Sequence, residues 1–85
     1  MIREAHAKNA LYAINEILVW ARTIAFEGQP HQKLAKLLDA AEELPMLIAR
    51  DDDTTDEFRS ALEGLAATYP ELQRTVTTFD HGPPR

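Results

Sequence analysis

The chain has 85 residues, the size of one small domain, and 45% of them are hydrophobic. Thirteen alanines and ten leucines stand against two valines, and this preference for helix formers excludes a β-rich sandwich, a fibrous repeat and a disordered chain. The absence of cysteine excludes disulfides, thiol catalysis and cysteine-ligated metals. No apolar run reaches the roughly 20 residues of a membrane span, and residues 1–4 lead into a helical pattern rather than a signal peptide, so we expect a cytoplasmic protein with no membrane partner.

The net charge of −5 is concentrated in one stretch of the chain. Residues 42–58 carry Arg50 against seven acidic side chains, whereas the segments before and after this stretch are nearly neutral. The acidic patch consists of Glu42, Glu43, Asp51, Asp52, Asp53, Asp56 and Glu57. The lysines and arginines are scattered singly, so we expect no nucleic-acid partner, whereas the patch is a candidate surface for a basic protein.

A first amphipathic helix is predicted over residues 3–26. It stops at Gly28, which favours a left-handed cap, and Pro30 is suited to open the next helix. At 100° per residue, a broad apolar face for packing within the chain is formed by Ala10, Ile14, Ile17, Leu18, Ala21, Ile24 and Ala25.

Three large apolar residues, Tyr12, Val19 and Phe26, interrupt the polar side of this helix at a spacing of seven. They are either isolated exposed residues, or residues covered by tertiary neighbours, or a second contact seam. We favour a seam for self-association as a homodimer, because so short a chain has few elements with which to cover both sides of one helix. Trp20 lies at the border between the apolar and the polar face of this helix, as an interface anchor or as a partly buried core residue. With its charged rim, the predicted seam comprises Tyr12, Val19, Phe26, Glu16, Arg22 and Trp20.

A second helix is predicted over residues 30–44, with leucines at helical spacing. Pro45 lacks the N–H that a helix interior requires, yet the apolar residues 46–49 remain in phase. The helix therefore either kinks at Pro45 or ends there and restarts as a short turn to about Arg50.

A third helix is predicted to follow the aspartate triplet 51–53. The triplet lacks the ligand spacing of a calcium-binding hand, whereas Thr54 followed by Glu57 matches a capping box. Thr68, followed by proline and glutamate, repeats the start signal, so residues 70–79 form a fourth helix or a bent continuation. We expect a single helical domain over residues 1–79 and a disordered tail over residues 80–85.

No catalytic, cofactor-binding or metal-ligating set is recognisable in the sequence. His6, His31 and His81 lack the spacing of metal ligands, Ser60 lies in no nucleophile motif, and the glycines form no phosphate-binding loop. We therefore expect a protein that is not an enzyme and that uses no cofactor or metal.

The expected fold is all-α, a small antiparallel bundle of three main helices plus a short C-terminal helix. The second and third helices are expected to form an up-down pair on the broad face of the first, with the C-terminal segment as a cap. The leading functional hypothesis is a non-enzymatic protein-interaction module that self-associates. The alternatives are an acidic inhibitor, immunity or antitoxin-like protein that binds a basic partner through residues 42–57, and a small-ligand-binding helical bundle.

Overall fold

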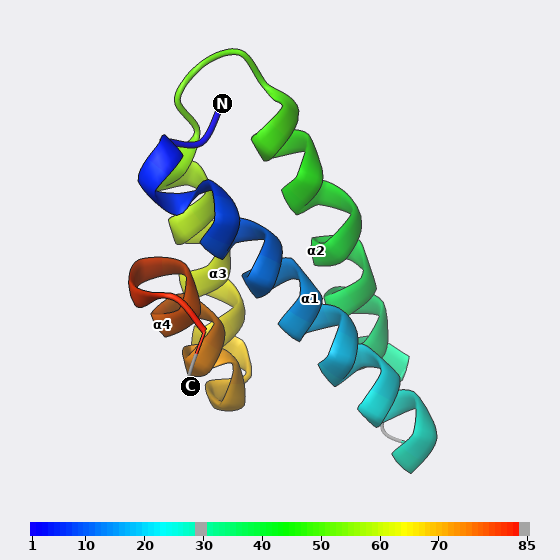
Figure 1. Ribbon diagram of the computed structural model, residues 1–85. Helices are drawn as coiled ribbons and strands as arrows, with labels where there is room; N and C mark the ends of the chain where they lie inside the picture. Colours follow the sequence, from blue (N-terminus) through cyan, green and yellow to red (C-terminus); the bar gives the residue numbers. More distant parts are fainter. Residues whose placement is uncertain (29–30, 84–85) are drawn as a thin grey trace.

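The computed structural model describes residues 1–28 and 31–83, and all regular structure in these segments is helical. This confirms the predicted all-α fold with three main helices and a short C-terminal one. Helices α1 and α2 form a long antiparallel hairpin, and α3 and α4 lie together beside its upper part (Figure 1). The elements are α1 (Glu4–Glu27), α2 (His31–Ala49), α3 (Thr55–Thr68), the 3-10 turn η1 (Pro70–Leu72) and α4 (Gln73–His81).

Helix α1 ends where its sequence predicts. Gly28 has φ 70° and ψ 29°, in the left-handed region that glycine adopts without steric cost, and its N–H donates to the carbonyl of Ile24. The predicted role of Pro30 in opening the next helix falls outside the described residues, and α2 is described from His31 onward.

The buried side of α1 is narrower than the sequence predicts. Its buried residues are Ala10, Ala13, Ile14, Ile17, Ala21 and Ile24. Leu18 and Ala25, expected on this face, are exposed instead. The reason is geometric: at 100° per residue the arc covered by the other helices ends at Ile14, and Leu18 and Ala25 lie just beyond it.

Helix α2 continues through Pro45 rather than ending there. Leu44 is buried immediately before the proline, and Ile48 is half-buried against the core one turn later. Pro45 is exposed, so its ring lies on the solvent side. Burial of the residues around the proline holds the helical path despite the backbone hydrogen bond that proline cannot make.

The start of α3 uses a different cap from the predicted one. Thr54 occupies the N-cap position, but its hydroxyl donates to the carbonyl of Leu47 rather than accepting from the helix. Asp53 takes over that role, since its Oδ1 accepts the N–H of Thr55 at 2.9 Å. The predicted capping box of Thr54 and Glu57 is therefore wrong. Thr54 is fully buried, so its hydroxyl needs a hydrogen-bond partner inside the fold, and the carbonyl of Leu47 supplies it.

The short C-terminal helix is part of the core rather than a cap on it. Helix α4 packs against both α1 and α3, while α3 has much less contact with α2 than the predicted up-down pair requires. Phe79 of α4 is fully buried between Phe58 of α3, with ring centroids 4.8 Å apart, and His6 of α1, at 5.0 Å. Helix α4 thus packs between α1 and α3, and α2 packs mainly on α1.

The ends of α4 also differ from expectation. The 3-10 turn η1 separates α4 from α3, and Thr68 bonds back to the carbonyl of Gly64 instead of capping a new helix. Asp80 and His81 close α4, so the predicted disorder is wrong for these two residues. The guanidinium of Arg59 binds the Asp80 carboxylate through both oxygens, at 2.9 and 2.8 Å, and this fixes the last turn. The same prediction for residues 84–85 lies outside the described part of the chain.

Candidate functional site

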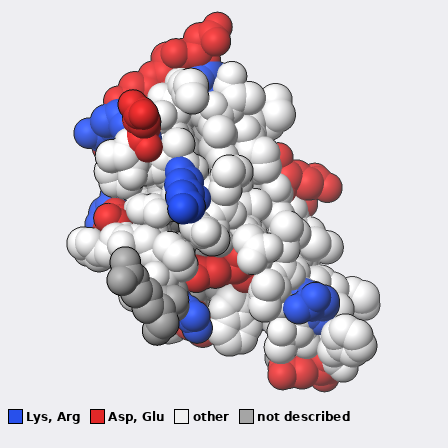
Figure 2. Space-filling view, in the orientation of Figure 1, with Lys and Arg blue, Asp and Glu red and all other residues white. Residues whose placement is uncertain are grey.

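The three apolar residues of the predicted seam are all exposed. Phe26 is 86% exposed, whereas Tyr12 (39%) and Val19 (42%) are partly covered, and Nζ of Lys8 lies 5.9 Å from the ring centroid of Tyr12. The structure adds a neighbouring row at the same spacing of seven, formed by Leu11 (61%) and Leu18 (45%). We call these five residues the α1 face. They form two rows on the exposed side of α1, with Lys8, Asn15 and Arg22 between them, and Figure 2 shows single charged side chains scattered among uncharged surface.

The two predicted rim residues of the seam have different environments. Arg22 is exposed. The side chain of Glu16 is only 19% exposed: its Oε2 accepts the hydroxyl of Thr78 at 2.8 Å and lies 3.8 Å from Nε of Arg74. Its Oε1 is buried and receives no hydrogen bond within the described structure. Glu16 is thus tied mainly to α4, a partner that the wheel of α1 could not reveal.

Trp20 combines both roles considered for it. Its side chain packs against the core, and it also lines a shallow pocket of about 370 Å³ beside the α1 face. Val19, Glu16, Thr23 and Arg74 complete the lining.

The acidic patch is partly neutralised within the chain. Arg50 pairs with Asp52 and Glu57, at 2.6 and 2.9 Å, and Arg3 pairs with Asp53 and Asp56, at 3.4 and 3.1 Å. Sequence reasoning counted Arg50 but missed Arg3, which is some 50 residues away along the chain.

Hydrogen bonds lower the pKa of two carboxyls in this patch. The bond from Arg50 lowers the pKa of Asp52, and the bonds from Thr55 lower that of Asp53. The remaining acids, Asp51, Glu42 and Glu43, are exposed, the last two on α2. The patch therefore divides into an ion-paired loop, visible at the top of Figure 2, and separate α2 carboxylates.

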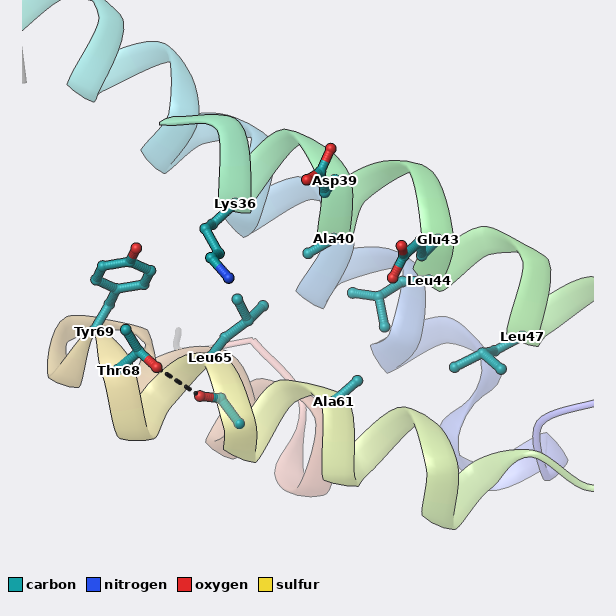
Figure 3. Close-up of a pocket in the computed structure, with 11 residues that line it drawn as sticks. Lys36, Asp39, Ala40, Glu43, Leu44, Leu47, Ala61, Leu65, Thr68 and Tyr69 are labelled. Atoms are coloured by element: carbon teal, nitrogen blue, oxygen red, sulfur yellow. Dashed lines mark hydrogen bonds between the residues drawn. The ribbon is translucent and has the colours of Figure 1, made fainter. Parts of the chain in front are cut away.

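A groove between α2 and α3 is the feature that sequence reasoning missed. Its volume is about 500 Å³ (Figure 3). The α2 wall consists of Lys36, Asp39, Ala40, Glu43, Leu44 and Leu47. The opposite wall consists of Ala61, Gly64, Leu65, Thr68 and Tyr69. The signal in the sequence was the small size of Ala40, Ala61 and Gly64, which leaves the space between α2 and α3 unfilled.

Comparison of the chain with protein-family models, with curated proteins and with solved structures found no match. Within residues 1–28 and 31–83, no three His, Asp or Glu side chains cluster closely enough to hold a metal ion. In the same segments, no helix has the length and apolar content to cross a bilayer.

Proposed function

We propose that this protein is a non-enzymatic helical interaction module of the cytoplasm, and that it self-associates as a homodimer through the α1 face. The observation that carries the proposal is the exposure of five large apolar side chains on one side of a helix whose other side is the core. Several large apolar side chains gathered on the exposed side of one helix are typical of interaction sites, whereas single exposed residues are not.

The energetic balance supports association. Complete burial of one large apolar side chain is worth about 1.5–3 kcal/mol. Since Phe26 is 86% exposed and the other four are 39–61% exposed, burial of all five in each protomer offsets the several kcal/mol that association costs. A domain of this size buries only about 60–65% of the surface that its unfolded chain exposes, so a partner adds to its stability.

The spacing of Tyr12, Val19 and Phe26 makes this row of the α1 face self-complementary. Tyr12 and Phe26 lie seven residues on either side of Val19. In an antiparallel dimer with a two-fold axis at Val19, the partner's Phe26 lies at the level of Tyr12, and the two Val19 side chains meet. An isologous contact of this type needs only one patch on each protomer.

The polar residues agree with the same arrangement. Glu16 and Arg22 each lie three residues from Val19, so an antiparallel pair places them at the same level along the helix axis. Glu16 is already bound to Thr78 within the chain, so it contributes its charge rather than a new hydrogen bond; the partner's exposed Arg22 is opposite in sign, and no like charges meet at that level, which favours the antiparallel over the parallel pairing.

Sedimentation equilibrium of the unmodified protein and of Val19→Glu tests the proposal. We expect a mass of about twice the chain mass of 9.6 kDa for the unmodified protein at high micromolar concentration. Val19→Glu places two carboxylates at the axis, and we expect it to give a monomer with an unchanged helical circular dichroism spectrum. The matched control is Met46→Glu, because Met46 is 66% exposed but lies on α2, outside the α1 face. An unmodified protein that is monomeric at this concentration contradicts the proposal, as does a Val19→Glu dimer.

A further inference from the structure

The groove between α2 and α3 is polar at one end and apolar at the other. Lys36 extends from α2 toward Leu65, and the hydroxyl-bearing residues Thr68 and Tyr69 lie at the same end (Figure 3). Leu44 and Leu47 line the other end (Figure 3). The groove thus places hydrogen-bond donors beside an elongated apolar channel.

Contacts within the chain join the two sides of the groove near both of its ends. At the polar end, Lys33 forms an ion pair with Glu71, and its Nζ lies 5.2 Å from the ring centroid of Tyr69. At the apolar end, the hydroxyl of Thr54 donates to the carbonyl of Leu47 and holds the loop against α2. The two walls are therefore fixed at their ends, and the space between them is a feature of the folded chain.

The ammonium of Lys36 is the cation available to a ligand in this groove. Within the described part of the chain it takes part in no ion pair, whereas Lys33 is paired with Glu71. We propose that the groove binds a free, singly charged anionic amphiphile, a medium-chain alkyl carboxylate, with its carboxylate on Lys36 and its alkyl chain along Leu44 and Leu47.

Length and charge select this ligand class. The 11 residues from Lys36 to Leu47 span about 16 Å of helix, which suits an extended alkyl chain of medium length. Asp39 and Glu43 lie along the α2 rim between these ends and repel any second negative charge on the chain. A volume of about 500 Å³ is typical of small-molecule sites between bundle helices, and the walls combine leucine and alanine side chains with polar and charged ones.

Calorimetric titration with dodecanoate, below the concentration at which it aggregates, tests the proposal. We expect saturable binding of one molecule per chain. Gly64→Leu fills the groove, and a Cβ at this position meets no atom within 4 Å, so the variant folds and we expect binding to be lost. Lys36→Met removes the cation, and we expect about tenfold weaker binding.

Three controls separate this site from others. Ala67→Leu adds the same side chain at an exposed α3 position outside the groove, and Lys8→Met removes a lysine of α1; both retain binding. We expect Val19→Glu to retain binding as well. This result would show that dodecanoate does not bind at the α1 face, and that its binding does not require the proposed dimer. Dodecanedioate binds at least tenfold more weakly than dodecanoate. Absence of saturable binding, binding that survives Gly64→Leu, or equal affinity for the two acids overturns the proposal.

Discussion

The ring of Phe79 stacks on that of Phe58, with 4.8 Å between centroids and 28° between the ring planes. These residues belong to α4 and α3, and both are fully buried. Through this contact the C-terminal helix becomes the link between α1 and α3.

We expect Phe79→Ala to lower the free energy of unfolding by about 3–5 kcal/mol, because it leaves a cavity where three helices meet. The matched control is Phe26→Ala, which removes the same side chain from a position that is 86% exposed. Urea denaturation at a concentration where both variants are monomeric measures the two effects, and we expect a change below about 0.5 kcal/mol for Phe26→Ala. Equal effects would contradict the core position of α4.

The start of α3 depends on Asp53 for its cap. We expect Asp53→Ala to cost about 1 kcal/mol of stability, because the N–H of Thr55 loses its acceptor. Asp51→Ala is the matched control, since this neighbouring aspartate is exposed and supplies no cap within the described structure. Thermal denaturation of the two variants distinguishes them, and equal midpoints would rule out the Asp53 cap.

Thr54 stabilises the loop by another route. Thr54→Val keeps the shape of the side chain but removes the hydroxyl that donates to the carbonyl of Leu47. We expect a loss of about 1–2 kcal/mol, because a buried carbonyl is left without a donor. Chemical denaturation of the variant measures it, with Thr77→Val, at an exposed position, as the control. An unchanged denaturation midpoint for Thr54→Val would contradict a stabilising role of this bond.

Stability is expected to fall in acid through Asp80 and Glu71. The hydrogen bond from Arg59 lowers the pKa of Asp80 below its ordinary 3.8, and that from Lys33 lowers the pKa of Glu71 below its ordinary 4.5. A carboxyl whose pKa is lower in the folded state stabilises the fold above its ordinary pKa, and this contribution is lost as pH falls through the lowered value. Denaturation midpoints measured from pH 6 downward should decline below about pH 4.5.

The matched variant for this prediction is Asp80→Asn, which cannot ionise. It should be less stable than the unmodified chain at pH 6, and the difference should shrink as the pH falls, because protonation removes the same interaction from the unmodified protein. A constant difference across this range would show that the Arg59–Asp80 pair is not the source.

Gly64 lowers the helix propensity of α3, although neither its backbone conformation nor a neighbouring atom requires a glycine at this position. A Cβ built on it meets no atom within 4 Å, and its φ lies outside the left-handed region. We therefore expect Gly64→Ala to raise the free energy of unfolding by about 0.5–1 kcal/mol, because alanine has the higher helix propensity. Urea denaturation checks this, and a loss of stability would indicate that the space beside Gly64 is occupied in solution.

The sequence by itself determined the helices and the apolar residues that lie outside the core. Helical periodicity and the left-handed propensity of Gly28 are local properties, so they predicted α1 and its end. The same periodicity separated Tyr12, Val19 and Phe26 from the buried face, because a side chain's direction on a helix depends only on its position along the chain.

Only the tertiary structure decided which helices meet and which polar groups pair. Phe79 looked like one apolar residue of a weak terminal helix, and its contacts with Phe58 and His6 depend on chain closure over 21 and 73 residues. The same holds for Arg3, which neutralises part of the acidic patch, and for Thr78, which binds Glu16. Such contacts arise from the packing of whole helices, and no local propensity encodes them.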